Sequence, residues 1–428
     1  MAATSAPSVT RGPTRDTERA PAPDLARGFM LVLIALANTP FYLWASQAGA
    51  SGTAHPVDGS VADRVTQFLV MTTVDLRVYP MFAFLFGYGM VQLFRRQVSS
   101  GTPEGRARRL LQRRNLWLLL FGFVHAALLW MGDVLGAYGL AGLILVGLFF
   151  RRRDRTLVVW ASVLTGLLVL MVAFSAVGAF FAMQLPPSEA AAMSFSFEEP
   201  SIGDPDYLRS IADRLLFWLG LSVGQGLLML VVPIMILLAF VAARREILER
   251  PGQHLRLLRT TAVAGIAVGW LGGLPHALVH VGAWDFPEQI SWVFMPLQLF
   301  TGLFGGLGYV ALFGLLGHRI AISGARPAPT SPAGSVIAVG KRSLSCYLAQ
   351  SVLCAPVLAA WGLGLGEHMG SFVMALYAVV VWLVTLVLAV WFERTGRRGP
   401  AEVLLRRLVY RRAATPAPAP QAGQERPV

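Results

Sequence analysis

The sequence has 428 residues, of which 55% are hydrophobic and only 14% are charged, and its formal net charge is +13. A soluble chain of this length needs about 25% charged residues to cover its domains, so this composition excludes a soluble multidomain protein. The basic residues stand in short runs between apolar stretches and gather in no single segment, which excludes a nucleic-acid partner as the reason for the charge. We therefore expect an integral membrane protein whose main partner is the lipid bilayer.

The chain opens with a polar segment rich in proline and arginine, residues 1–24, which we expect to be a disordered tail. Ten apolar runs follow, and each is close to the roughly 20 residues that a helix needs to span the hydrocarbon core. We expect transmembrane helices at 25–47, 66–94, 115–132, 134–150, 156–183, 214–242, 260–281, 291–317, 343–362 and 371–392. The first ten residues of the second run are expected to lie at the interface and to lead into a span from about Val78.

The fold class that follows is an all-α, polytopic integral membrane protein. Residues 25–412 are expected to form a single transmembrane helical domain, and residues 413–428 a second disordered tail. With the N-terminus inside, the inner segments hold 32 of the 36 basic residues, and this bias predicts that both termini are cytoplasmic. The longest outer loop, residues 184–213, is acidic instead.

His125 and Asp133 form the sharpest polar cluster within the apolar runs, where an unpaired ionisable group costs several kcal/mol. Eight residues separate them, so direct contact needs a bend near Gly132 or a partner on another helix. In a functional interpretation, His125 is an intramembrane base reachable from the outer side, and Asp133 orients it. In a structural interpretation, His125 bonds a neighbouring helix and Asp133 caps the fourth helix.

Asp24 and Arg27 lie on one face at the start of the first helix. They can pair with each other, or Arg27 can offer its forked donors to a phosphate or carboxylate at the membrane surface. Arg77 is two residues from Asp75, so the two do not face each other on a helix and each needs another partner.

His276 and His280 are four residues apart and share one helical face. Two ligands do not make a metal site, and no Glu lies between them, so we predict an acceptor-binding or structural role and no metal. Further candidates for substrate binding are Asp24, Arg77, Tyr138, Gln350 and Asn38, the last in the middle of the first span.

Five blocks of sequence stand out together. They are Asp24-x-x-Arg27-Gly28 with Asn38, residues 77–89, residues 113–138 with His125, Asp133 and Tyr138, residues 340–351, and residues 399–406. These blocks resemble the YeiB-like bacterial membrane proteins, a family named as a domain of unknown function, and the C-terminal block covers about residues 340–412. The family is similar at its N-terminus to transmembrane acyltransferases. That resemblance implies a plasma-membrane protein that uses acyl-CoA or a similar donor and an envelope glycan or small-molecule acceptor.

Three classes of function follow from these residues. In an acyltransferase, His125 deprotonates the acceptor, Asp133 orients it, and Arg27 or the basic inner loops hold an anionic donor. In a transporter or exporter of a small molecule or lipid-linked substrate, the same residues line the path. In a structural or partner-binding membrane protein, their truncation has no consequence beyond folding. No oligomeric state is predicted.

Overall fold

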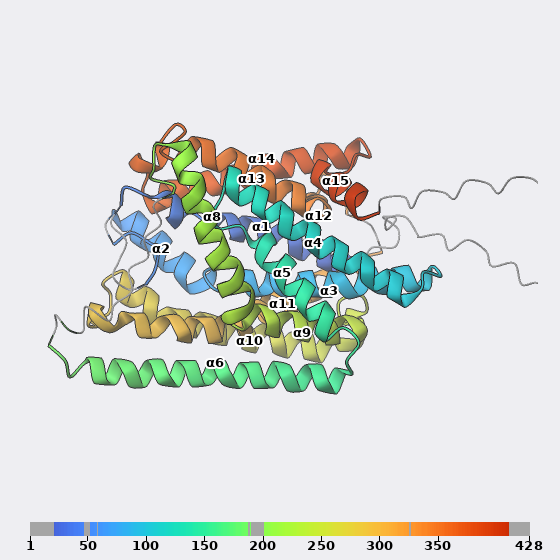
Figure 1. Cartoon of the computed structure of the whole chain (residues 1–428), viewed down its shortest axis with the longest axis horizontal. Helices are drawn as coiled ribbons and strands as arrows, with labels where there is room; N and C mark the ends of the chain where they lie inside the picture. The colour runs from blue at the N-terminus through green and yellow to red at the C-terminus, as the bar shows by residue number, and fades with distance from the viewer. Residues whose placement is uncertain are drawn as a thin grey trace, which may run out of the picture.

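The computed structural model describes residues 21–46, 52–57, 59–186, 189, 201–324 and 327–410. Over these ranges the protein is a bundle of helices, most of which run along one common direction (Figure 1). Six helical stretches are long and apolar enough to cross a membrane: Val61–Ser99, Asp154–Ala182, Tyr207–Leu228, Pro251–His280, Ile290–Ile322 and Ser371–Arg394. The all-α, multi-pass membrane fold expected from the sequence is confirmed.

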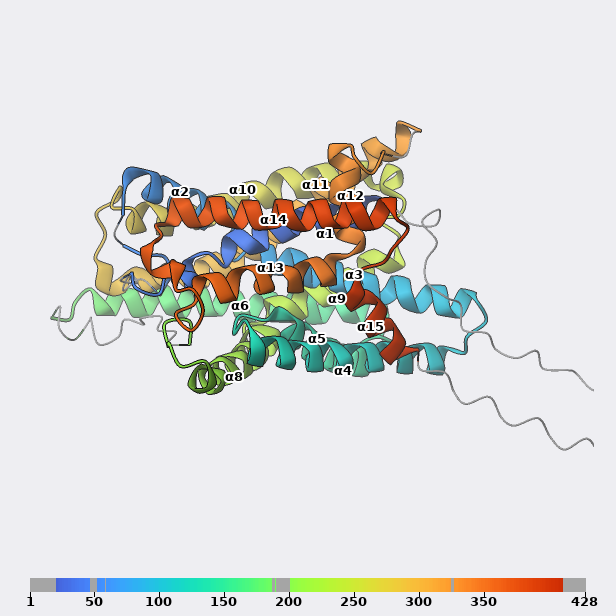
Figure 2. The ribbon, with the colours of Figure 1, turned by 90° about the horizontal axis from the view of Figure 1, so that it is seen from above.

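The first half of the bundle consists of α1 (Pro21–Ala37), α2 (Val61–Thr73), α3 (Val78–Ser99), α4 (Glu104–Leu128), α5 (Val134–Leu148) and α6 (Asp154–Ala182). The second half consists of α8 (Tyr207–Val223), α9 (Val231–Arg244), α10 (Leu255–His280), α11 (Phe294–Ile322), α12 (Pro332–Lys341), α13 (Ser343–Leu358), α14 (Ser371–Arg394) and α15 (Pro400–Val409). Short helical turns lie at Pro40–Tyr42, Gly224–Leu228, Pro251–His254, Glu288–Val293 and Leu365–His368. α3 and α9 pack together in the core, whereas α6 covers the outside of α9 and α11 (Figures 1 and 2).

Several expected boundaries were wrong. α1 begins at Pro21, so the last four residues of the expected tail are helical, while residues 1–20 and 413–428 lie outside the described residues. α1 also ends at Ala37, before Pro40, so Asn38 follows the helix and does not lie in the middle of a span. Proline cannot donate a backbone hydrogen bond, and the chain turns there.

Two other expected helices are interrupted by a residue in the left-handed region. The run at 66–94 breaks at Leu76 (φ 58°), between α2 and α3, so a helix does begin at Val78, where we expected a span to start. The run at 214–242 breaks after a π-helical turn at Leu230 (φ 63°), and α8 crosses the bundle more steeply than α9 (Figure 1). Apolar composition alone carries no signal for either break.

Close helix packing holds the first of these breaks. A Cβ at Gly302 of α11 would overlap the carbonyl of Leu76, and one at Gly306 would lie 2.8 Å from the Cβ of Pro80. These glycines therefore let α11 touch the junction of α2 and α3, as small residues do where membrane helices pack closely.

The arginine-rich segments collect at one end of the bundle, where α3, α5, α9 and α14 end and α4 begins (Figure 1). We call this the basic end. At the opposite end α10 ends and α8 and α14 begin (Figure 1). Any site inside the bundle is therefore bounded by one strongly cationic end.

Candidate functional site

The hairpin of α4 and α5 brings His125 and Asp133 together. A Cβ at Gly122 would overlap Asp133 Oδ2, and a Cβ at Gly139 would lie 2.7 Å from the Leu119 nitrogen. Because no side chain separates the two helices here, Asp133 is pressed against α4 beside His125. The turn around Gly132 supplies the bend that direct contact between the two requires.

The contact fixes the proton position on His125. Its Nδ1 lies 2.8 Å from Oδ1 of Asp133, and the two side chains are 2% and 0% exposed. An ionised carboxylate only accepts, so Nδ1 is the donor in this contact. When the imidazole is neutral, Nε2 therefore carries its lone pair. Nε2 is buried and has no hydrogen-bond partner in the described part of the chain. A buried imidazole with an oriented ring and an unused basic nitrogen is suited to act as a general base.

Asp133 has further partners that hold it in place. Its Oδ2 accepts from the Gly136 nitrogen at 2.8 Å and from Trp218 Nε1 at 3.4 Å, and its Oδ1 accepts from the Tyr347 hydroxyl at 3.4 Å. Asp133 is therefore the N-cap of α5 and the orienting partner of His125 at once. The ring of Tyr347 also packs edge-on against the imidazole, with centroids 5.3 Å apart.

A cavity of about 1120 Å³ lies among residues of the basic end and is also lined by Tyr347, whereas His125 and Asp133 do not line it. Its inner wall includes Leu135, Tyr138 and Tyr347, the last of which bonds Asp133. The cationic lining residues are Arg27, Arg95, Arg96, Arg114, Arg250, Lys341 and Arg406, and the acidic ones are Asp24, Glu246, Glu249 and Glu402. Seven cations against four carboxylates give the cavity a positive potential, which favours an anionic ligand.

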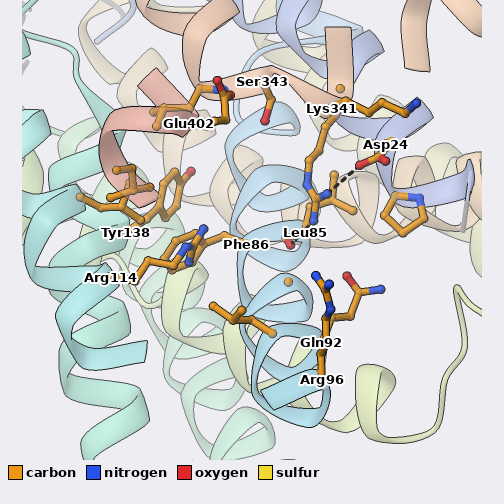
Figure 3. A pocket seen from close by; sticks show the side chains of 18 of the residues that line it. Asp24, Leu85, Phe86, Gln92, Arg96, Arg114, Tyr138, Lys341, Ser343 and Glu402 are labelled. Atoms are coloured by element: carbon orange, nitrogen blue, oxygen red, sulfur yellow. Dashed lines mark hydrogen bonds and ion pairs between the residues drawn. The ribbon is translucent and has the colours of Figure 1, made fainter. Parts of the chain in front are cut away.

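Asp24 and Arg27 lie on the wall of this cavity (Figure 3). Arg27 Nη1 donates to Asp24 Oδ1 at 3.1 Å, and Nη2 donates to the Leu85 carbonyl at 3.4 Å. The predicted pair at the head of α1 is therefore present. The Arg27 side chain remains 22% exposed, so the ion pair does not remove it from the cavity surface.

Arg114 is a cavity residue that sequence reasoning passed over. Its guanidinium lies 5.2 Å from the centroid of the Phe86 ring, on the wall that also carries Tyr138 (Figure 3). Its Nη1 is buried without a hydrogen-bond partner among the described residues. Arg114 precedes His125 by eleven residues, or about three helical turns. The two residues therefore lie within about 20° of each other around α4 and about 16 Å apart along it. That three-turn spacing was the signal that could have found it.

Tyr138 joins the cavity wall to the core. Its hydroxyl donates to the Tyr79 carbonyl at 2.9 Å, and its ring packs against Phe82. Gln350 instead links two helices, because its Nε2 donates to the Leu31 carbonyl at 3.2 Å. Asn38 does not line the cavity.

Arg77 belongs to a second polar group, away from the cavity. Its guanidinium is fully buried and donates to the carbonyls of Gly269 at 2.7 Å and Met71 at 3.0 Å. It also donates to Gln298 Oε1 at 3.3 Å. These bonds link the junction of α2 and α3 to α10 and α11. The pattern of apolar residues in the sequence could not predict these partners.

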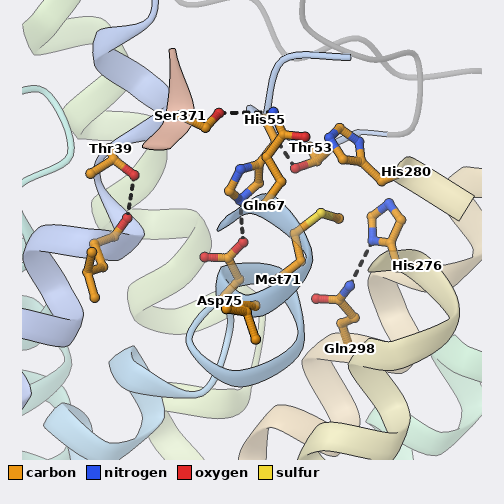
Figure 4. Close-up of polar contacts among 12 residues, drawn as sticks. Thr39, Thr53, His55, Gln67, Met71, Asp75, His276, His280, Gln298 and Ser371 are labelled. Carbon is orange, nitrogen blue, oxygen red and sulfur yellow. Dashed lines mark hydrogen bonds and ion pairs between the residues drawn. The ribbon is translucent and has the colours of Figure 1, made fainter. Parts of the chain in front are cut away.

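The histidines of α10 belong to the same second group (Figure 4). His276 Nδ1 lies 2.8 Å from Gln298 Nε2, whereas His280 Nε2 lies 3.0 Å from the Pro56 carbonyl. His55 bonds Asp75 at 2.7 Å, which gives Asp75 the separate partner that the sequence required. Although His276 and His280 share a helical face, they turn to different partners. The described ranges contain no group of three or more His, Cys, Asp or Glu side chains arranged to hold a metal ion.

Fold and site together define a class of protein. It is a multi-pass helical membrane protein with a buried His–Asp pair and a positively charged cavity, which are joined through Tyr347. Such a pair is a place for proton transfer shielded from bulk water.

Comparison with known proteins narrows the class. Residues 242–412 match the family described as a protein of unknown function, DUF418. The chain is 28% identical over 415 residues to the uncharacterized protein YxaH of Bacillus subtilis (strain 168), covering 93% of this chain and 96% of the relative. It is 28% identical over 362 residues to the uncharacterized protein YeiB of Escherichia coli (strain K12), covering 80% and 84%. No solved structure matches the chain. The chain is therefore similar to YxaH and YeiB along most of its length, and residues 242–412 match a domain of unknown function, which confirms the resemblance of its five sequence blocks.

Proposed function

We propose that the protein is an acyltransferase embedded in the bacterial plasma membrane, which moves an acyl group from a cytoplasmic donor to an extracytoplasmic acceptor. One observation carries the proposal. Tyr347 lines the cationic cavity and bonds the same Asp133 that contacts His125. The positive-inside rule supports a cytoplasmic basic end, with both termini on that side.

The cavity suits a large anionic donor such as acyl-CoA. Its volume of about 1120 Å³ exceeds the roughly 300–1,000 Å³ of most small-molecule sites. Arg27 and Arg114 present guanidinium groups to the interior, and guanidinium groups bind phosphates in a forked geometry. The carrier would bind along these arginines, with its acyl thioester pointing toward Tyr347.

The chemistry then runs through Nε2 of His125. This nitrogen takes the proton of the acceptor hydroxyl or amine as the acceptor attacks the thioester carbonyl. The new acyl bond forms, the carbon–sulfur bond breaks, and the leaving thiolate takes the proton back from Nε2. Asp133 stabilises the imidazolium that exists between the two steps.

The test compares a deletion strain with strains that produce the wild type, His125→Ala or His318→Ala. His318 lies on α11 and does not line the cavity, so its variant is a matched control. Mass spectrometry of lipids and envelope glycans should show an acylated product in wild type and His318→Ala, and its loss in the other two strains. Identical profiles in all four strains, with each protein present in the membrane, contradict the proposal.

A second measurement separates an enzyme from a transporter. Purified full-length protein in proteoliposomes receives a donor labelled in its acyl group. Label appearing in a new covalent product supports acyl transfer. Movement of the unchanged compound across the bilayer, without a product, would instead assign the cavity to a transporter or exporter.

A further inference from the structure

A second hollow of about 360 Å³ lies beside the mouth of the cavity, between the end of α14 and α15. It is lined by Arg398, Val403, Arg406, Arg407 and Tyr410. Three of these five residues are arginines and none is acidic. Figure 2 shows α15 at the basic end, where it packs against both α4 and α13.

The positive charge of this hollow is not neutralised by the carboxylates of the same part of the chain. Glu393 accepts from Lys341 at 2.5 Å and from Arg342 at 2.6 Å. Glu402 accepts from the Leu344 nitrogen at 2.9 Å at the start of α13. Glu393 thus links α14 to Lys341 and Arg342, and Glu402 links α15 to α13, so both carboxylates are already engaged.

The arginines are close enough to repel each other. Burial and the nearby charge of Arg398 lower the pKa of Arg406 from its usual range, although the guanidinium stays protonated at neutral pH. The Tyr410 oxygen accepts from Gln97 Nε2 at 3.4 Å, which leaves its own hydrogen to donate. Three cations and a hydroxyl donor around one hollow give it the charge and the donors that an anion needs.

The outer face of α15 suits a membrane surface. Leu404 is 51% exposed, and Arg407, one turn later on the same face, is also exposed. An apolar side chain beside an arginine matches the boundary between acyl chains and headgroups, where the leucine contacts the chains and the arginine reaches the phosphates. Val409, on another face, is buried against the bundle.

We propose that this hollow binds the phosphate of an anionic phospholipid headgroup, with Arg398, Arg406 and Arg407 as its ligands. Arginine forks match phosphate oxygens in geometry and charge. The exposed Leu404 favours a lipid over a soluble phosphate, because it places the hollow at the acyl-chain boundary. Arg406 and Tyr410 line both the hollow and the cavity, so the bound lipid would lie at the cavity mouth.

The experiment titrates purified, delipidated full-length protein with phosphatidylglycerol or zwitterionic phosphatidylcholine and counts bound lipids by native mass spectrometry. The variant is Arg398→Gln with Arg407→Gln, two residues of the hollow that do not line the cavity. The control, Arg151→Gln with Arg153→Gln, removes the same charge from the exposed turn between α5 and α6. Each direct hydrogen bond from an arginine to the phosphate is worth on the order of tenfold in affinity, so the variant should lose on the order of 100-fold for phosphatidylglycerol.

The control should bind phosphatidylglycerol as wild type does, and phosphatidylcholine should bind weakly to all three proteins. An Arg398→Lys, Arg407→Lys protein should recover most of the affinity, which excludes misfolding as the cause. Equal binding by the variant and the control overturns the proposal. A parallel titration with inorganic phosphate tests the soluble source: if phosphate binding needs the two arginines and phosphatidylglycerol binding does not, the site is not a lipid site.

Discussion

Asp133→Asn separates the chemistry of the site from its folding. Asparagine is as good an N-cap as aspartate, and its amide oxygen can accept from the Gly136 nitrogen, now 2.8 Å from Asp133 Oδ2. The amide nitrogen then faces His125 Nδ1, across the 2.8 Å contact now made by Oδ1. An amide nitrogen only donates, so Nδ1 must accept and the imidazole proton moves to Nε2. The cap is kept and the base is lost.

Asp133→Asn should affect acyl transfer far more than it affects stability. Acyl transfer should fall on the order of 10⁴-fold, as it does when the wrong histidine tautomer is imposed on a His–Asp pair. The free energy of unfolding should change by less than about 1 kcal/mol, since the cap hydrogen bond remains. Asp133→Ala, in contrast, leaves the buried donors of His125, Gly136 and Trp218 unpaired, and each costs about 1–3 kcal/mol.

The assay measures transfer of a labelled acyl group by each protein in proteoliposomes, and thermal unfolding is followed by tryptophan fluorescence. Wild-type transfer by Asp133→Asn would refute the orienting role of the carboxylate. Unfolding of Asp133→Asn at the same temperature as Asp133→Ala would show that the aspartate acts on stability alone.

Three further predictions concern the surroundings of the site. Arg114→Gln should raise the KM for an anionic donor about 10- to 100-fold with kcat nearly unchanged, because one charged hydrogen bond is lost far from the reacting atoms; an unchanged KM in steady-state kinetics contradicts this. Gly122→Ala should destabilise the protein by about 1–3 kcal/mol, since its Cβ overlaps Asp133; an unaltered unfolding temperature contradicts this. Arg209 holds the pKa of Asp204 below its usual range, so the pair stabilises fully above the ordinary aspartate pKa and this is lost as the pH falls through the lowered value. Asp204→Asn should remove that part of the acid dependence in melts at a series of pH values.

The long apolar helices could be located from the sequence by their composition, but their interruptions could not. The breaks at Leu76 and Leu230 place non-glycine residues at positive φ. Tertiary contacts stabilise such conformations. Near Leu76, Arg77 donates to a carbonyl of α2, and Gly302 of α11 leaves room for the Leu76 carbonyl. The periodicity of the sequence cannot predict these interruptions, since the contacts that stabilise them come from elsewhere in the chain.

The candidate site was likewise predictable only where it depends on local sequence. His125 and Asp133 could be selected as ionisable groups within an apolar region, and their contact follows from a short hairpin. Trp218 and Tyr347 are 85 and 214 residues from Asp133, so no local pattern could assign them. The pairing of His276 with Gln298 was likewise hidden, because it depends on how α10 and α11 face each other.

The single helix that carries both Arg114 and His125 has a consequence for substrate choice. α4 is continuous from Glu104 to Leu128, so the distance of about 16 Å between these residues is set by a rigid element. Within the proposed reaction, α4 fixes the distance between the residue that binds the anionic group and the residue that acts as the base. A carrier whose anionic group and thioester are separated by about that length can satisfy both residues at once. A shorter carrier bound to Arg114 would not bring its thioester carbonyl within reach of the acceptor at Nε2. The enzyme would therefore select donors by the distance between their anionic group and their thioester.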